Sequence, residues 1–257
     1  MLNTIYLSAA TVFIFMVILF IAAQIKKDNS IVDIGWGIGF ILIALVLLAG
    51  KDSADLKELI ITAMIIIWGS RLAFHIFIRA RGKGEDFRYA QWRKDWGEKA
   101  SVNSFFKVFM LQGILMIFIS LPIQVVFNGG KNELNIISLI GLIIFFSGFL
   151  FESIGDYQMY RFKKKPENKG KIITSGLWKY TRHPNYFGEA LLWWGIGIYS
   201  YGSELFLLSL AGPLLINLLL VFVSGVPMLE KKYEGNKEWE SYKSKTPAFI
   251  PFIGRKG

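Results

Sequence analysis

Long apolar runs separated by short charged segments make up most of this chain. Several runs approach or exceed the roughly twenty residues with which an α-helix crosses a bilayer. The pattern predicts an all-α polytopic membrane protein with seven transmembrane helices, or six if the sixth or seventh apolar segment is re-entrant. The predicted spans cover residues 5–25, 31–50, 59–80, 105–127, 136–160, 186–201 and 205–228, with a kink at Pro122 in the fourth.

No internal repeat, low-complexity tract or linker interrupts the chain. We therefore expect a single integral membrane domain over residues 1–257. The first apolar run has no basic segment before it and is longer than the core of a signal peptide. We expect it to be retained as a span.

Basic residues are distributed unevenly between the predicted loops. Of the 29 Lys and Arg, only Lys51, Lys57 and Lys131 fall on one side of the predicted membrane, and Arg71 lies within a span. All the others fall in the opposite loops and the C-terminal tail. Because basic residues concentrate in cytoplasmic loops, this asymmetry predicts an external N-terminus and a cytosolic C-terminus.

The composition excludes several kinds of chemistry. The chain has no cysteine, which excludes disulfides, thiolate metal sites and cysteine nucleophiles. It has only two histidines, so no metal site is expected. The net charge is +10, but the basic residues follow the loops between apolar runs, which argues against a nucleic-acid partner.

The segment from Gly176 to Glu189 gathers more chemically able groups than any other part of the chain. Pro184 disfavours helix at His183, so we expect an extended entry into a helix beginning near Asn185. Arg182 and His183 then lie at a helix N-terminus, where a phosphate or carboxylate is favoured. The alternative is an interfacial basic loop that binds lipid headgroups.

Charged residues inside predicted spans are costly, so they are candidate functional residues. In the predicted topology they all lie towards the cytosolic side, where they could line one cavity. The alternative for each is a buried hydrogen bond or ion pair that holds helices together. The candidates are Asp33 on the second span, Arg71 and His75 on one face of the third, Glu152 and Asp156 on one face of the fifth, and Glu189 on the sixth.

The loop after the third span mixes acids with bases. It contains Glu85, Asp86, Arg88 and Tyr89, next to flexible glycines. These residues are candidates for binding or catalysis. The alternative is a solvated loop whose charges pair with one another.

The segment Gly176-Leu-Trp-Lys-Tyr-Thr-Arg-His-Pro-Asn-Tyr-Phe-Gly-Glu189 resembles the signature of steroid 5α-reductase-like membrane proteins, in particular the DUF1295 branch. Ser70-Arg-Leu, Gly84-Glu-Asp-Phe-Arg-Tyr89, Asp156-Tyr-Gln and the ending over residues 242–252 also fit this branch. The resemblance covers most of the chain. It implies a seven-span enzyme of a bacterial inner membrane with a cavity open to the cytosol.

The resemblance further implies that the cavity holds NADPH and that hydride transfer reduces a conjugated C=C bond of a hydrophobic, lipid-like substrate. Basic residues would hold the phosphates, and acids and amides would fix the ribose and carboxamide. The cofactor contacts implied are Glu152, Asp156, Lys163, Lys171, Arg182, His183, Asn185, Tyr186 and Glu189, with Glu85, Asp86 and Arg88 from the loop.

A proton donor is also needed for that reaction. His75, Tyr89 or a protonated Asp33 could donate, and Arg71 would orient the donor or the substrate oxygen.

Two alternatives remain open. Isoprenylcysteine carboxyl methyltransferases carry a similar Arg-His-Pro-x-Tyr motif. On that scaffold Arg182 and His183 would bind the carboxylate of S-adenosylmethionine, while Glu230, with Tyr233 nearby, would bind its amine or ribose. The other alternative is a membrane protein that binds lipid without catalysis.

Overall fold

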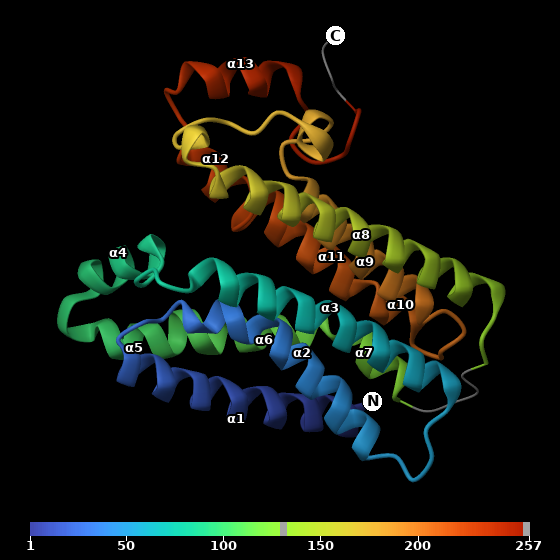
Figure 1. The fold of residues 1–257 in the computed structure, drawn as a ribbon. Helices are drawn as coiled ribbons and strands as arrows, with labels where there is room; N and C mark the ends of the chain where they lie inside the picture. Colours follow the sequence, from blue (N-terminus) through green and yellow to red (C-terminus); the bar gives the residue numbers. More distant parts are fainter. Residues whose placement is uncertain (129–132, 254–257) are drawn as a thin grey trace. The chain divides into compact units, whose positions relative to one another are not determined.

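A computed structural model describes residues 1–128 and 133–253 (Figure 1). Within these ranges the chain is helical and contains no strand, which confirms the all-α prediction. Lys131 lies outside the described residues. The chain divides into two compact units. The first unit comprises Met1–Asn135 and Ser200–Ala211, and the second comprises Ile136–Tyr199 and Gly212–Gly257. The single-domain organisation stays a prediction.

The first unit is built around three long helices and a shorter, interrupted one. α2 packs against both α1 and α3, and α6 packs against α1 (Figure 1). Gly37 and Gly69 let the backbones of α2 and α3 approach closely. The elements are α1 (Leu2–Lys26), α2 (Ile31–Ala49), α3 (Leu56–Ala80), α4 (Phe87–Trp96), η1 (Gly97–Lys99), α5 (Ala100–Ser104), η2 (Phe105–Met110), α6 (Leu111–Ile119), α7 (Leu121–Val126) and α10 (Phe206–Ser209).

The second unit is organised by one antiparallel helix pair, α8 and α9, which lie side by side in Figure 1. A smaller group of elements near the C-terminus completes it. The elements are α8 (Ile136–Lys164), η3 (Pro166–Asn168), η4 (Gly176–Lys179), α9 (Pro184–Tyr199), α11 (Ala211–Leu218), η5 (Leu219–Val223), α12 (Val226–Lys231) and α13 (Lys237–Lys245).

Glycines at seven-residue spacing form the contact between α8 and α9. On α8 these include Gly141 and Gly148, and on α9 they are Gly188 and Gly195. A Cβ added at Gly148 would come closer than 3.0 Å to the backbone of Leu192 and Gly188. Seven residues are close to two helical turns, so each glycine lies on the same face as the next. The spacing therefore makes one continuous small-residue seam.

Six helical segments within the described ranges are long and apolar enough to cross a membrane. They identify an integral membrane protein by length and composition. The segments are Leu2–Lys26, Ile31–Ala49, Leu56–Ala80, Phe87–Ile119, Ile136–Lys164 and Phe206–Lys231. The sixth span expected from the sequence corresponds to α9, which has 16 residues and is not among the six. The seven-span count and the orientation stay predictions.

The predicted fourth span differs most from the structure. The helical segment starts earlier, at Phe87, and breaks at Ser120, two residues before Pro122. Proline fits the start of α7 because its missing amide hydrogen leaves no helical hydrogen bond unmade there.

Candidate functional site

The motif around His183 changes from irregular backbone to helix at Pro184. α9 begins there, one residue before the predicted start, and the Phe187 amide donates to the His183 carbonyl at 3.0 Å. Proline suits the first helical position because its φ is already helical. The start of α9 therefore fixes the backbone of His183.

Glu230 of α12 joins the two basic side chains of this motif. Its Oε1 accepts hydrogen bonds from Arg182 Nε at 2.8 Å and from His183 Nε2 at 3.1 Å. Its Oε2 lies 3.9 Å from Lys243 Nζ. The side chains of Arg182, His183 and Glu230 are 8%, 4% and 12% exposed. Because water is largely excluded, these groups attract one another more strongly than on an open surface.

Backbone carbonyls also accept hydrogen bonds from the Arg182 guanidinium, at a nitrogen other than the one that contacts Glu230. Nη1 donates to the Thr246 carbonyl at 2.5 Å and to the Lys243 carbonyl at 3.2 Å. The guanidinium carbon lies 5.9 Å from the centre of the Trp239 ring, which adds a cation–π contact. Nη2 is the only guanidinium nitrogen that has no hydrogen-bond partner among the described residues.

A second polar atom of the cluster is available for a ligand. His183 Nδ1 is buried and makes no hydrogen bond within the part of the chain that the structure describes. A buried polar atom without a partner is costly, so this nitrogen is a candidate contact for a ligand or a water molecule. With Arg182 Nη2 and Glu230 Oε2, the cluster offers both a cationic donor and an anionic acceptor. This combination suits a zwitterionic group.

Tyr242 of α13 anchors the C-terminal part of the unit. Its hydroxyl donates a hydrogen bond to the Trp178 carbonyl. Burial raises the pKa of Tyr242 above its ordinary value, the charge of Arg182 opposes this, and the charge of Glu230 adds to it. The hydroxyl therefore stays protonated near neutral pH and keeps donating.

The residues predicted on and after α8 occupy two kinds of environment. Glu152 and Asp156 are buried, and the backbone of Gly188 in α9 packs against Glu152. Lys163 and Lys171 are exposed, in a segment rich in lysine. Their assignment as cofactor contacts stays a prediction.

The residues predicted on α9 lie in its first turns. Asn185, Tyr186 and Glu189 are half-buried, and the rings of Tyr186 and His183 stack with their centres 5.5 Å apart. Tyr233 stacks against Trp239 at 4.9 Å, in the aromatic cluster that also supports Arg182. Their roles also stay predictions.

The first unit brings together a different group of predicted residues. Asp33 Oδ1 accepts a hydrogen bond from the Tyr89 hydroxyl at 2.5 Å, and Asp33 Oδ2 accepts one from Arg88 Nη2 at 3.0 Å. Gln112 Nε2 lies 3.4 Å from the Tyr89 hydroxyl. Arg71 and His75 lie on α3 and are half-buried. Catalytic roles for these residues stay predictions.

The loop before α4 is held by its own charges. Asp86 caps α4 by accepting hydrogen bonds from the Arg88 amide at 3.1 Å and from Arg88 Nε at 2.9 Å. Glu85 accepts one from the Asn29 amide at 2.7 Å and pairs with Arg93 at 2.8 Å. Burial raises the pKa of Asp86, but hydrogen bonds and charge from Arg88 outweigh burial and lower it below the ordinary value. The charges of the loop thus pair partly with one another and partly with Asp33 and Asn29, and the proposed binding roles of Glu85, Asp86 and Arg88 stay predictions.

Arg182, His183 and Glu230 are called the Glu230 cluster from here on. Sequence reasoning missed several groups that contact this cluster or lie next to it in the chain. Thr181 is fully buried beside it, and the carbonyls of Lys243 and Thr246 bind Arg182. A carbonyl is present at every residue, so the sequence carries no signal for these contacts. Thr181 was inside the motif but has no distinctive chemistry.

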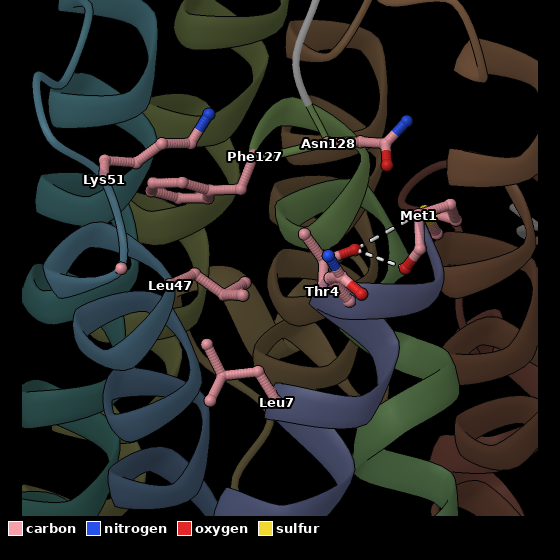
Figure 2. Close-up of a pocket in the computed structure, with 9 residues that line it drawn as sticks. Met1, Thr4, Leu7, Leu47, Lys51, Phe127 and Asn128 are labelled. Carbon is pink, nitrogen blue, oxygen red and sulfur yellow. Dashed lines mark hydrogen bonds between the residues drawn. The ribbon is translucent and has the colours of Figure 1, made fainter.

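A pocket of about 270 Å³ lies in the first unit, between the start of α1 and the end of α2 (Figure 2). Leu7, Leu47 and Phe127 form its apolar lining, and Lys51 lies at its edge. Lys51 pairs with the buried Glu58 at 2.7 Å, so its charge is balanced. None of the predicted site residues lines this pocket.

The chain matches the family described as "Protein of unknown function (DUF1295)" over residues 19–246, and it belongs to this family. This confirms the family resemblance seen in the sequence. No solved structure gives a significant match.

Three curated relatives are named as methyltransferases. Methanethiol S-methyltransferase of Crocosphaera subtropica is 28% identical over 57% of this chain and 63% of its own length. Protein-S-isoprenylcysteine O-methyltransferase of Saccharomyces cerevisiae is 34% identical over 35% of this chain and 37% of its own length. A probable O-methyltransferase, ustE, of Ustilaginoidea virens is 38% identical over 29% of this chain and 26% of its own length. The chain thus spans less than two thirds of each relative.

These relatives correct the function expected from the sequence. The NADPH-dependent reductase reading, with its oxidoreductase activity and its NADPH cofactor, is wrong, because the relatives are named as O- or S-methyltransferases. They support the alternative with S-adenosylmethionine. The physical reason for the error is that a basic pair at a helix N-terminus favours any anion, and phosphate and carboxylate are not distinguished by that feature.

Proposed function

We propose that this protein is a membrane-embedded methyltransferase that binds S-adenosylmethionine through Arg182, His183 and Glu230. The observation that carries the proposal is the sharing of Glu230 Oε1 between Arg182 and His183 in a largely buried cluster. The names of the relatives supply the reaction class. Transfer to an oxygen or a sulfur acceptor fits those names equally well.

The residues present fit the amino-acid end of this cofactor. Its carboxylate needs a cationic donor, and Arg182 Nη2 has donors without a partner among the described residues. Its ammonium needs an anionic acceptor, and among the described residues Glu230 Oε2 has only a long contact, 3.9 Å, to Lys243. The buried His183 Nδ1 can accept or donate one further hydrogen bond. Carboxylate and ammonium would therefore both be matched in one small cluster.

The chain's own residues would orient the cofactor and exclude water. When bound, S-adenosylmethionine supplies a methyl group on a positively charged sulfur. The Trp239 ring lies against the Arg182 guanidinium, and the Tyr233 ring stacks on Trp239, so aromatic side chains limit the access of water to Arg182. Glu230 and Arg182 fix each other before a ligand arrives, so less orientational freedom is lost on binding.

The acceptor is proposed to be hydrophobic and lipid-like. Six apolar segments embed the protein in a bilayer, where an apolar acceptor is concentrated. The Glu230 cluster is proposed to face the cytosol, because the segments around it carry most of the exposed lysines of the second unit.

Calorimetric titration of the purified protein tests the proposal. We expect S-adenosylmethionine and its demethylated product to bind, and NADPH not to bind. Arg182→Lys should weaken binding about tenfold or more, because an ammonium cannot replace the planar fork of a guanidinium. Arg161→Lys is the matched control, since Arg161 is exposed and contacts Tyr157. Absence of binding in the folded wild-type protein would refute the proposal and favour lipid binding without catalysis.

A further inference from the structure

A C-terminal strap, defined here as Thr246–Phe252, runs along the residues that lead into α9. The Arg182 amide donates to the Pro247 carbonyl at 2.9 Å, and the Phe252 amide donates to the Tyr180 carbonyl at 3.2 Å. The backbone of the motif is therefore hydrogen-bonded to the strap at two points. The guanidinium of Arg182 adds a third through the Thr246 carbonyl.

Aromatic contacts hold the far end of the strap in a strained conformation. The Phe252 ring lies 4.6 Å from the Tyr180 ring, and the Phe249 ring lies 6.1 Å from the Phe187 ring. Phe252 has a φ of 68°, in the left-handed region that bulky residues rarely adopt. A residue keeps such a strained backbone conformation only where several contacts with the surrounding structure hold it in place. The strap is thus held in one conformation by its contacts with the residues around α9.

Thr181 lies between the strap and the Glu230 cluster. Its hydroxyl lies 2.8 Å from the Phe249 carbonyl and 3.1 Å from the Ala248 carbonyl, so one proton is shared between two strap acceptors. The same hydroxyl accepts a hydrogen bond from the His183 amide at 3.3 Å. Thr181 is fully buried, and water cannot replace these bonds without opening the strap.

We propose that Thr181 is a positioning residue, through which the strap sets the geometry of Arg182 and His183. It touches no reacting atom. It fixes the backbone immediately before both basic residues, and the strap carbonyl of Thr246 fixes the Arg182 side chain. The consequence for S-adenosylmethionine affinity rests on the proposed function.

Substitutions of Thr181 separate positioning from simple packing. Thr181→Val keeps the shape and removes the hydroxyl, whereas Thr181→Ser keeps the hydroxyl and removes a methyl group. We expect Thr181→Val to raise the Kd for S-adenosylmethionine about tenfold, and Thr181→Ser to stay within about twofold of wild type. Thr174→Val is the control, because Thr174 is exposed in the same unit.

Hydrogen–deuterium exchange gives a readout that does not depend on the ligand. In Thr181→Val the amides of Arg182 and Phe252 should exchange faster, because their acceptors belong to the contact between the strap and the motif. Amides of the seam near Gly148 should keep wild-type protection. Thr181→Ser should restore slow exchange.

The outcomes distinguish this inference from the proposed function. Wild-type binding with equal affinity in Thr181→Val would overturn the positioning role, as would equal weakening in Thr181→Val and Thr181→Ser. If the wild-type protein does not bind S-adenosylmethionine, the proposed function fails. The positioning role of Thr181 is then tested by hydrogen–deuterium exchange alone. Faster exchange confined to the strap, Arg182 and His183 then supports the positioning role, and unchanged exchange overturns it.

Discussion

His183 and Glu230 are 47 positions apart in the chain, yet His183 Nε2 lies 3.1 Å from Glu230 Oε1. The same oxygen accepts from Arg182 Nε. One carboxylate oxygen therefore balances two basic side chains that are adjacent in the sequence. The other oxygen of Glu230 lies 3.9 Å from Lys243 Nζ.

Replacing Glu230 with glutamine tests this arrangement. Glu230→Gln keeps the shape but removes the negative charge, so Arg182 remains in a largely buried place without its counter-ion. We expect S-adenosylmethionine affinity to fall at least about tenfold and the free energy of unfolding to fall by about 1–3 kcal/mol. Calorimetry and thermal unfolding in detergent measure the two effects.

Glu234→Gln is the matched control for that substitution. Glu234 is an exposed glutamate in the segment that follows α12. It should change neither affinity nor stability measurably. Equal behaviour of the two variants would contradict a special role for Glu230.

The apolar runs predicted the helices of this protein well. α1, α2, α3 and α8 begin or end within a few residues of the predicted spans, because bilayer thickness dictates their length and hydropathy. The fourth span was placed less well. The helical segment that contains it begins with α4, whose charged residues do not resemble a span and contact distant residues such as Asp33.

The site was predictable only in part. Arg182 and His183 follow from the motif, because a proline after a basic pair indicates the start of a helix. Glu230 was singled out from the sequence only for the methyltransferase alternative, and its hydrogen bonds to Arg182 and His183 follow from the fold alone. The cofactor was predicted wrongly because a basic pair at the start of a helix favours a phosphate and a carboxylate alike.

Asp86 gives a prediction about pH. Its folded pKa lies below the ordinary value of 3.8, so the unfolded chain takes up a proton first as the pH falls. Its contribution to stability is therefore fully present above the unfolded pKa and is lost as the pH falls through the folded pKa. Asp86→Asn keeps a capping side chain and removes only the charge. Amide exchange of α4 should differ between wild type and this variant near neutral pH.

That difference should shrink as the pH is lowered below the ordinary carboxyl value of 3.8. Asp95→Asn, at an exposed position of the same helix, controls for a general loss of charge. A difference that stays constant over the whole pH range would show that the charge of Asp86 does not stabilise the cap.

The seam between α8 and α9 gives a prediction about stability. Gly148→Ala would place a Cβ against backbone atoms of Leu192 and Gly188, which cannot move aside as a flexible side chain can. Alanine favours helix by about 1 kcal/mol over glycine, but overpacking against backbone costs more. We expect net destabilisation of about 1–3 kcal/mol, measured by thermal unfolding in detergent. Gly84→Ala has nothing within 4 Å of the added Cβ and should leave the melting temperature unchanged.

The contact between Arg182 and Glu230 also constrains the membrane topology. Two residues 2.8 Å apart lie on the same side of a bilayer, so the chain between them crosses an even number of times. The segment Phe206–Lys231, from α10 to α12, is long and apolar enough to cross. If that segment crosses, we predict that α9 crosses as well, although its 16 residues span only about 24 Å. Its packing along α8 from Gly155 to Gly141 supports this, because α8 is long enough to cross.

Single cysteines test this seven-span topology in a chain that has none of its own. We expect Ser53→Cys and Glu204→Cys to react with a membrane-impermeant maleimide from outside intact cells, and Ser175→Cys to react only after lysis. The expectation for Glu204 follows from a crossing by α9, and the other two positions serve as references for the two sides. Labelling of Glu204→Cys only after lysis, with the references behaving as expected, would mean that α9 is re-entrant. The even number of crossings would then require that the segment Phe206–Lys231 also returns to the side from which it enters.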